Sequence, residues 1–167
     1  MTVKTTRFGE IDIADEKIIA FRDGLPGFEE LKRFALISTE ETDPFHWFQA
    51  MDDPDVALAV INPFQLFPDY SPMIDDSVFD DLGVASDEDI LLLTVAVIPQ
   101  EFRNMTTNLT APILINTIKN CGRQVILEVG DYEVRRPIYE PIQEYTMGRG
   151  EADAGADAQG GPGDNAG

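Results

Sequence analysis

Two continuous apolar runs constrain this chain more than any other feature of its sequence. They are Val56–Ile61 (VALAVI) and Ile90–Ile98 (ILLLTVAVI), the second interrupted only by Thr94. Both are far shorter than the roughly 18–20 apolar residues that a membrane-spanning helix needs. Continuous runs of this length are typical of strands that are buried on both faces or that line a closed barrel.

Shorter patterns predict further strands and two hairpins. Segments rich in aromatic and aliphatic residues predict strands, and a short loop with turn residues between two such segments predicts a hairpin. The additional strands are Arg33–Ile37 and Phe45–Met51. The hairpins join Ile11 and Ile13 to residues 17–21 through Asp15–Glu16, and Gln124–Val129 to residues 132–136 through Gly130–Asp131.

One segment predicts a short amphipathic helix. Ser71 is a suitable N-cap, and Pro72 suits the first helical position because its missing N–H costs nothing there. An apolar stripe, two acids on the opposite side and a glycine stop follow, formed by Ile74, Val78 and Leu82, by Asp76 and Asp80, and by Gly83. The sequence thus predicts a mostly β fold: a compact, antiparallel, β-barrel-like single domain with one short amphipathic helix.

The predicted domain covers residues 1–147, and the segment 148–167 differs from it in composition. That segment holds no aromatic and no β-branched residue. Such a segment buries too little apolar area to offset the entropy of ordering it. We therefore predict a disordered acidic tail.

The charge of the chain is strongly acidic, with 31 acids against 12 lysines and arginines and a net charge of −19. Between Phe34 and Phe102 there are 15 acids and no lysine or arginine. Proteins that bind nucleic acid directly need basic patches, so we expect no direct contact with nucleic acid. The charge favours a basic protein partner, although an acidic host proteome would also explain the total.

The chain offers little for catalysis or metal binding. It has one histidine, His46, and one cysteine, Cys121, so a zinc site built from both residue types is out of reach. The acid clusters at Asp52–Asp55 and Ser86–Asp89 lack the spacing of a calcium loop, and each is interpreted as a solvated turn or cap. We expect no enzyme, no cofactor and no metal. With no disulfide pair and no apolar leader in the first 13 residues, we expect a cytoplasmic protein without a membrane segment.

Three motifs occur in a fixed order: FRDGLPGFEELKRFALI (Phe21–Ile37), INPFQLFPDY (Ile61–Tyr70) and NMTTNLTAPILINTIKNCGRQVIL (Asn104–Leu127). Together with the acidic helix and LLLTVAVIP, they resemble the bacterial flagellar assembly factor family (FliW) over nearly all of Met1–Tyr145. The resemblance implies a barrel-like antiparallel fold and function without catalysis. It also implies two partners, flagellin and the small RNA-binding carbon storage regulator (CsrA). The regulator represses translation of flagellin, and binding by a family member relieves this repression.

We expect partner contact at loop 63–70, loop 105–112 and the acidic helix, with Tyr70 half exposed. For each loop residue, scaffolding of the loop is the alternative interpretation. The candidate residues are Asn62, Phe64, Asp69, Tyr70, Asp76, Asp80, Asn108, Leu109 and Pro112. Two other functions remain open, a carboxylate-based hydrolase in a β-barrel and an unselective acidic chaperone of basic proteins. We expect a monomer when the protein is free.

Overall fold

A computed structural model of the chain describes residues 1–128 and 130–158. The strands are β1 (Thr2–Thr5), β2 (Gly9–Asp12), β3 (Ile18–Phe21), β4 (Arg33–Ser38), β5 (His46–Ala50), β6 (Ala57–Ile61), β7 (Ile90–Val97), β8 (Thr106–Thr107), β9 (Ile113–Asn116), β10 (Cys121–Gln124) and β11 (Arg136–Pro137). The helices are α1 (Pro63–Leu66), α2 (Asp76–Leu82) and α3 (Tyr139–Ala158), with 3-10 turns η1 (Asp15–Lys17), η2 (Glu40–Thr42), η3 (Asp87–Asp89) and η4 (Phe102–Asn104).

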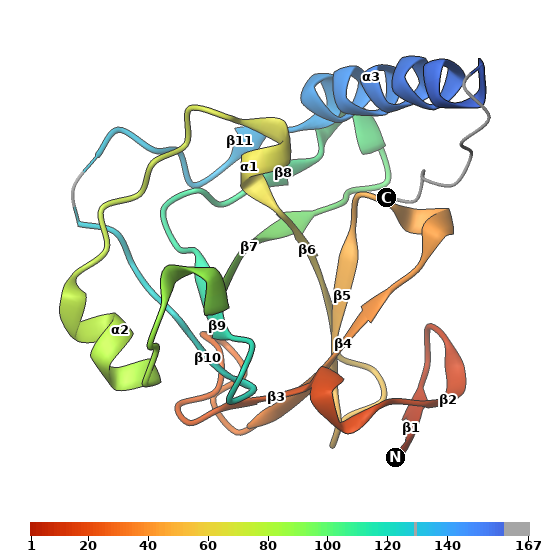
Figure 1. The fold of residues 1–167 in the computed structure, drawn as a ribbon. Helices are drawn as coiled ribbons and strands as arrows, with labels where there is room; N and C mark the ends of the chain where they lie inside the picture. The colour runs from red at the N-terminus through yellow and green to blue at the C-terminus, as the bar shows by residue number, and fades with distance from the viewer. Residues whose placement is uncertain (129, 159–167) are drawn as a thin grey trace.

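The sheet closes into a seven-stranded barrel, which confirms the predicted fold class. Its strands follow the order β7-β6-β5-β4-β3-β10-β9, and β9 pairs back onto β7 (Figure 1). Neighbouring strands are antiparallel except β3 and β10, which run parallel. The two apolar runs of the sequence are β6 and β7, next to each other in this ring. Because β9 pairs with β7, neither strand is left as the end strand of an open sheet.

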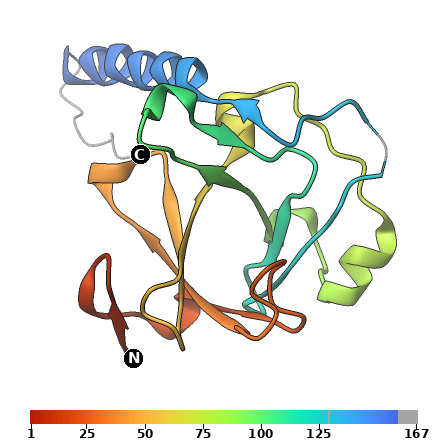
Figure 2. The ribbon, with the colours of Figure 1, turned by 180° about the vertical axis from the view of Figure 1, so that it is seen from behind.

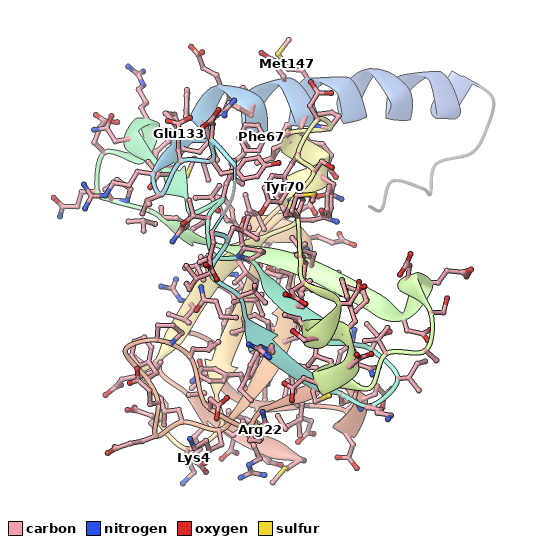
Figure 3. The ribbon with its side chains drawn as sticks, turned by 90° about the vertical axis from the view of Figure 1, so that its left-hand side faces the viewer. Lys4, Arg22, Phe67, Tyr70, Glu133 and Met147 are labelled. Carbon is pink, nitrogen blue, oxygen red and sulfur yellow. The ribbon has the colours of Figure 1, made fainter. Side chains whose placement is uncertain are left out.

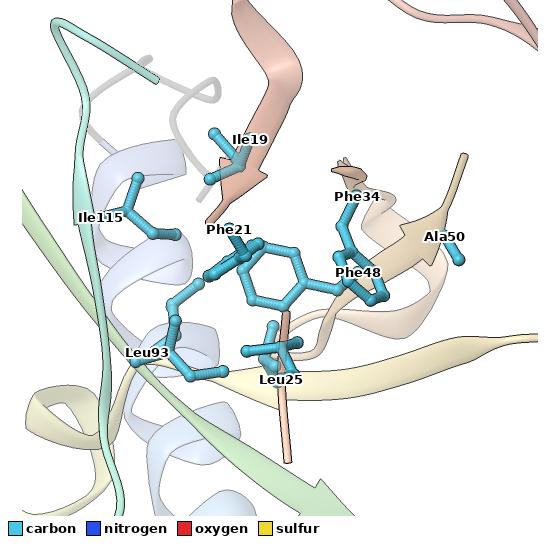
Figure 4. Close-up of a cluster of buried hydrophobic side chains, with 10 residues drawn as sticks. Ile19, Phe21, Leu25, Phe34, Phe48, Ala50, Leu93 and Ile115 are labelled. Carbon is cyan, nitrogen blue, oxygen red and sulfur yellow. The ribbon is translucent and has the colours of Figure 1, made fainter. Parts of the chain in front are cut away.

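Aromatic rings fill the inside of the barrel. Phe21, Phe34 and Phe48 are each fully buried, and they meet edge to face with centroid distances of 5.7, 5.7 and 6.3 Å. Leu25 and Leu93 pack against the same cluster (Figure 4). A small barrel leaves an interior just wide enough for side chains, so this one is a packed core and not a channel.

The first predicted hairpin is wrong. β2 pairs with β1, residue by residue from Thr2 opposite Asp12 to Thr5 opposite Gly9. β3 joins the barrel instead, between β4 and β10. Alternation of apolar residues identified β2 as a strand but could not choose its partner, and the N-terminal strand offered a closer one. The β1–β2 hairpin stands beside the barrel (Figure 2).

The second predicted hairpin is also wrong in the described residues. The backbone N–H groups of Val125 and Leu127 donate to the carbonyl oxygens of Pro112 and Thr110, at 2.9 and 2.8 Å. Residues 125–128 therefore run along the segment before β9 instead of folding back onto 132–136. Val129, at the end of the predicted strand, lies outside the described residues.

The predicted short helix exists, but it begins later than expected. α2 starts at Asp76, and its N-cap is Asp75, whose side chain accepts a 3.0 Å hydrogen bond from the Ser77 N–H. Residues 71–75 carry no helix, so the Ser71–Pro72 signal is not used, and Asp75 is the N-cap instead. The end is as predicted: Gly83 caps the helix at φ 69°.

Two further helices were not predicted. α1 is a single turn, and α3 begins at Tyr139 and includes residues 148–158 of the segment expected to be a disordered tail. Residues 159–167 lie outside the described residues, and the division of the chain at residue 147 stays a prediction. α3 lies across one end of the barrel (Figure 1) and anchors there through Ile142, which packs with Ile138 in a buried cluster. Over the described part of the chain, no helix is both long and apolar enough to cross a membrane.

The loop after β3 depends on Gly24, and a comparison with Gly27 in the same loop tests this. Both have positive φ, 68° and 87°. A Cβ on Gly24 would lie 2.7 Å from backbone atoms of Phe28 and Glu29, whereas a Cβ on Gly27 meets nothing within 4 Å. Gly27→Ala should cost about 1–2 kcal/mol of unfolding free energy, from its left-handed conformation alone.

Gly24→Ala should lower the unfolding free energy clearly more than Gly27→Ala does, because the backbone of Phe28 and Glu29 would have to move as well. Urea unfolding of both variants measures the difference. Equal costs would show that the loop around Gly24 yields freely.

Candidate partner-binding groove

A groove of about 920 Å³ opens on the outside of the barrel, between α1, α2 and the strands β7 and β9. We call it the α2 groove. Five of the nine predicted contact residues line it: Asn62, Phe64, Tyr70, Asp76 and Asp80. The structure thus brings together residues from the loop after β6 and from the acidic helix. The sequence had predicted both as contact regions but could not show that they lie side by side.

Asn62 shapes one end of this groove. Its side-chain oxygen accepts a 3.0 Å hydrogen bond from the Phe64 N–H and so caps α1. Pro63 occupies the first helical position, where it needs no hydrogen-bond partner. The tight turn leaves the Phe64 side chain 41% exposed. Asn62 is therefore a scaffold for the loop, and Phe64 is an apolar surface at the groove.

Tyr70 forms a wall of the groove, but it is only 5% exposed, so the expectation of a half-exposed Tyr70 is wrong. Its hydroxyl donates a 2.8 Å hydrogen bond to the Leu109 carbonyl. Its ring packs against Phe64 and Tyr132, with centroids 5.6 and 4.9 Å away. Burial raises the pKa of the Tyr70 hydroxyl, with a smaller contribution from Tyr132. Tyr70 lies below Phe67 and α3 in Figure 3.

The other predicted residues lie away from the α2 groove. Leu109 is 2% exposed and Pro112 is buried, so neither can serve as an exposed anchor in this conformation. Asn108 accepts hydrogen bonds from the N–H and hydroxyl of Thr110, at 2.9 and 2.6 Å, and holds its own loop. Asp69 is exposed and lines a smaller cavity of about 260 Å³ on the other side of Tyr70.

Helix α2 is held in place at its C-terminal end. The Asn116 side-chain N–H donates to the Leu82 carbonyl at 2.9 Å, and Asn116 is 2% exposed. Asp81 forms ion pairs with Arg22 and Arg123, both at 3.1 Å, which join the helix to the end of β3 and to β10. On its inner face Val78 packs in the same buried cluster as Leu82. These contacts fix one side of the groove relative to the barrel.

The acids of the α2 groove differ from Asp81. Asp76, Asp80 and Asp87 are exposed, and no ion pair or side-chain hydrogen bond engages them from residues 1–128 and 130–148. No lysine or arginine is among the residues that line the groove. Asp76 and Asp80 were predicted contact residues. Asp87 was not, because Ser86–Asp89 was interpreted only as a solvated turn or cap, and Ser86 does cap η3.

Half-buried apolar side chains form the floor of the groove, and sequence reasoning missed them. They come from the loop before α2, from α2, from the loop after it and from β7: Ile74, Phe79, Val84 and Ile90. Periodicity identifies Ile74 as part of the helix stripe and Ile90 as strand. It carries no signal that their exposed sides converge.

The one histidine of the chain, His46, lies away from this groove. The His46 ring nitrogen Nδ1 lies 2.6 Å from the Ser38 hydroxyl, across the β4–β5 pairing, and neither residue lines the α2 groove. Burial lowers the pKa of His46, with Asp43 acting against it. Among the described residues, no three His, Cys, Asp or Glu side chains could hold a metal ion.

Comparison with known proteins identifies the family. The family model described as FliW protein matches residues 2–138. The chain belongs to the FliW family. It is 42% identical over 144 residues to the flagellar assembly factor FliW of Caldanaerobacter subterraneus subsp. tengcongensis, covering 86% of this chain and 96% of that protein. It is 40% identical over 142 residues to that of Thermotoga neapolitana, covering 84% and 95%.

A solved structure agrees with this assignment. The crystal structure of a flagellar assembly factor FliW superposes with a TM-score of 0.77 at 33% identity, covering 83% of this chain and 97% of that one. The FliW resemblance expected from the three sequence motifs is confirmed.

The buried hydroxyl of Tyr70 gives a test of its structural role. In Tyr70→Phe the Leu109 carbonyl loses a buried donor, which should cost roughly 1–3 kcal/mol of unfolding free energy. Tyr132→Phe is the control, because the Tyr132 hydroxyl accepts from the exposed N–H of Ser71, which water can satisfy. Its cost should stay below about 1 kcal/mol. A stability loss in Tyr70→Phe no larger than in the control would contradict the structural role.

Proposed function

We propose that this FliW-family protein is a cytoplasmic, non-catalytic flagellar assembly factor that works by binding two proteins. It binds flagellin, and it binds the CsrA-type regulator and relieves the repression of flagellin translation. The free protein is a monomer. The related proteins carry the name flagellar assembly factor, and their likeness extends over most of this chain.

The observation that best supports a basic partner is the α2 groove with its unpaired carboxylates. Asp76 and Asp80 lie one helical turn apart on α2, about 5–6 Å between Cβ atoms, and Asp87 lies on the loop that follows. A field of one sign attracts a basic RNA-binding protein and repels the RNA that it carries. Such charges act mainly on the association rate.

Flagellin capture requires a different surface from the one that the sequence suggested. Apolar anchors at Tyr70 and Leu109 were expected, and both are buried. Apolar side chains that are exposed include Phe64, Val97 and Phe102. Burial of such side chains is less sensitive to salt than charge attraction is.

A hydrolase receives less support from this geometry. Acid–base catalysis by carboxylates needs partly desolvated groups that converge in a cleft. Asp76, Asp80 and Asp87 are instead exposed on the rim of the α2 groove. An unselective acidic chaperone would bind basic proteins without regard to this groove, and the experiment below separates it from the proposal.

Salt dependence and neutralisation of α2 test the function. In Asp76→Asn/Asp80→Asn, the association rate of the CsrA-type regulator should fall several-fold at low salt, because two rim charges are lost. Flagellin binding should be unchanged. Surface plasmon resonance across a salt series measures both. Glu40→Gln/Glu41→Gln is the matched control, because it removes the same charge from exposed positions on η2, which do not line the groove.

Two outcomes would contradict the proposal. If both double variants lower the association rate of the regulator equally, the rate depends on the net charge of the chain and not on the α2 groove. If an unrelated basic protein binds as well as the regulator does, the chain is an unselective acidic chaperone.

A further inference from the structure

The α2 groove combines two features that neither folding nor solubility requires together. Its floor contains half-buried apolar side chains, and its rim carries acids to which residues 1–128 and 130–148 supply no side-chain partner. The contrast between neighbouring residues is informative. Asp81 is neutralised by Arg22 and Arg123, whereas Asp80, the residue before it, has no such partner in the described part of the chain. The Asp81 carboxylate is therefore engaged in holding α2 against the barrel, whereas the Asp80 carboxylate is available to a partner protein.

We infer that the α2 groove docks a segment of a partner protein that carries apolar side chains flanked by lysine or arginine. The inference rests on the proposed function, that this chain is a protein-binding factor, and names the chemistry that one of its sites recognises. The apolar side chains of the segment lie on Ile74, Phe79 and Ile90. Its basic groups lie beside Asp76 and Asp80.

The size of the groove allows a protein segment, and its charge decides among macromolecular partners. At about 920 Å³ the groove is at the upper end of the roughly 300–1,000 Å³ of small-molecule pockets, so it holds several side chains. Its carboxylates repel phosphate, which excludes nucleic acid and anionic membrane surfaces as occupants. A second copy of this chain is disfavoured by the net charge of −19.

The spacing of the acids sets the spacing of the partner's basic groups. Carboxylates at positions i and i+4 of α2 match two basic side chains about 6 Å apart. Residues i and i+4 of a helix provide that spacing, as do residues i and i+2 of an extended strand. An apolar side chain on the same face of that helix or strand reaches the floor.

A substitution that fills the α2 groove with a large side chain tests the inference without removing contacts of the core. Ala85 is exposed and lines the α2 groove, so Ala85→Trp occupies it with a large side chain. Ala14→Trp is the matched control, because Ala14 is exposed, precedes η1 and does not line the groove. The probe is a short synthetic peptide of leucine and lysine, in which lysines four residues apart and a leucine between them share one helical face. Two further peptides replace every leucine by serine, or every lysine by glutamate.

Calorimetry with the full chain should give binding of the leucine–lysine peptide, at least about tenfold weaker in Ala85→Trp and unchanged in Ala14→Trp. Both replaced peptides should bind weakly. Equal binding to Ala85→Trp, or to the serine peptide, would overturn the inference. So would light scattering that shows the wild-type chain dimerising and Ala85→Trp monomeric, because the groove would then cover a second copy.

The proposed function and the groove inference can be contradicted independently of each other. If the wild-type chain binds neither flagellin nor the regulator, the proposed function is wrong, whatever the peptide does. If it binds both proteins and the peptide does not bind, the groove inference is wrong and the function stands.

Discussion

Closure of the sheet between β7 and β9 is the constraint on which the rest of the structure depends. Four residue pairs, from Ile90 opposite Asn116 to Leu93 opposite Ile113, complete the ring. The closed ring has no end strand, and its interior is filled by the phenylalanine cluster. Recognition is therefore left to what is attached outside the barrel.

The same closure positions the candidate site. Asn116 ends β9 and also donates to the last carbonyl of α2, so the strand that closes the barrel holds the helix that borders the groove. The ion pairs of Asp81 connect that helix to β3 and β10. Tyr70 joins the loop after β6 to the loop before β9 through its hydroxyl. Two buried polar contacts, Asn116 to Leu82 and Tyr70 to Leu109, thus hold segments that border the groove.

Strands and turns were predictable wherever a signal is local. The continuous runs at β6 and β7 predicted buried strands, Gly83 ended α2, and the turn at Asp52–Asp55 forms through the Asp53 side chain, which accepts from the Asp55 N–H at 3.0 Å. The choice of strand partner was not predictable for β2, because alternation gives the face of a strand and not its neighbour. The helix beginning at Tyr139 has almost no amphipathic pattern to reveal it.

The candidate site was predictable by charge and not by exposure. Asp76 and Asp80 follow from a helix period with acids on the outer side, and both are exposed. Tyr70 and Leu109 are large side chains in loops. Sequence alone does not show that the Tyr70 hydroxyl is buried and donates a hydrogen bond to the Leu109 carbonyl. The floor of the groove joins side chains from four segments, so no single window of sequence contains it.

Hydrogen–deuterium exchange of the full chain, with and without the CsrA-type regulator, tests the central claim most directly. The claim is that the barrel is a rigid scaffold and that the basic partner is recognised on its outside, at the α2 groove. The account predicts slower exchange in residues 71–92 when the regulator is bound, and unchanged exchange in the barrel strands β3 to β5. Protection confined to the β1–β2 hairpin or to α3, with residues 71–92 unaffected, would contradict it.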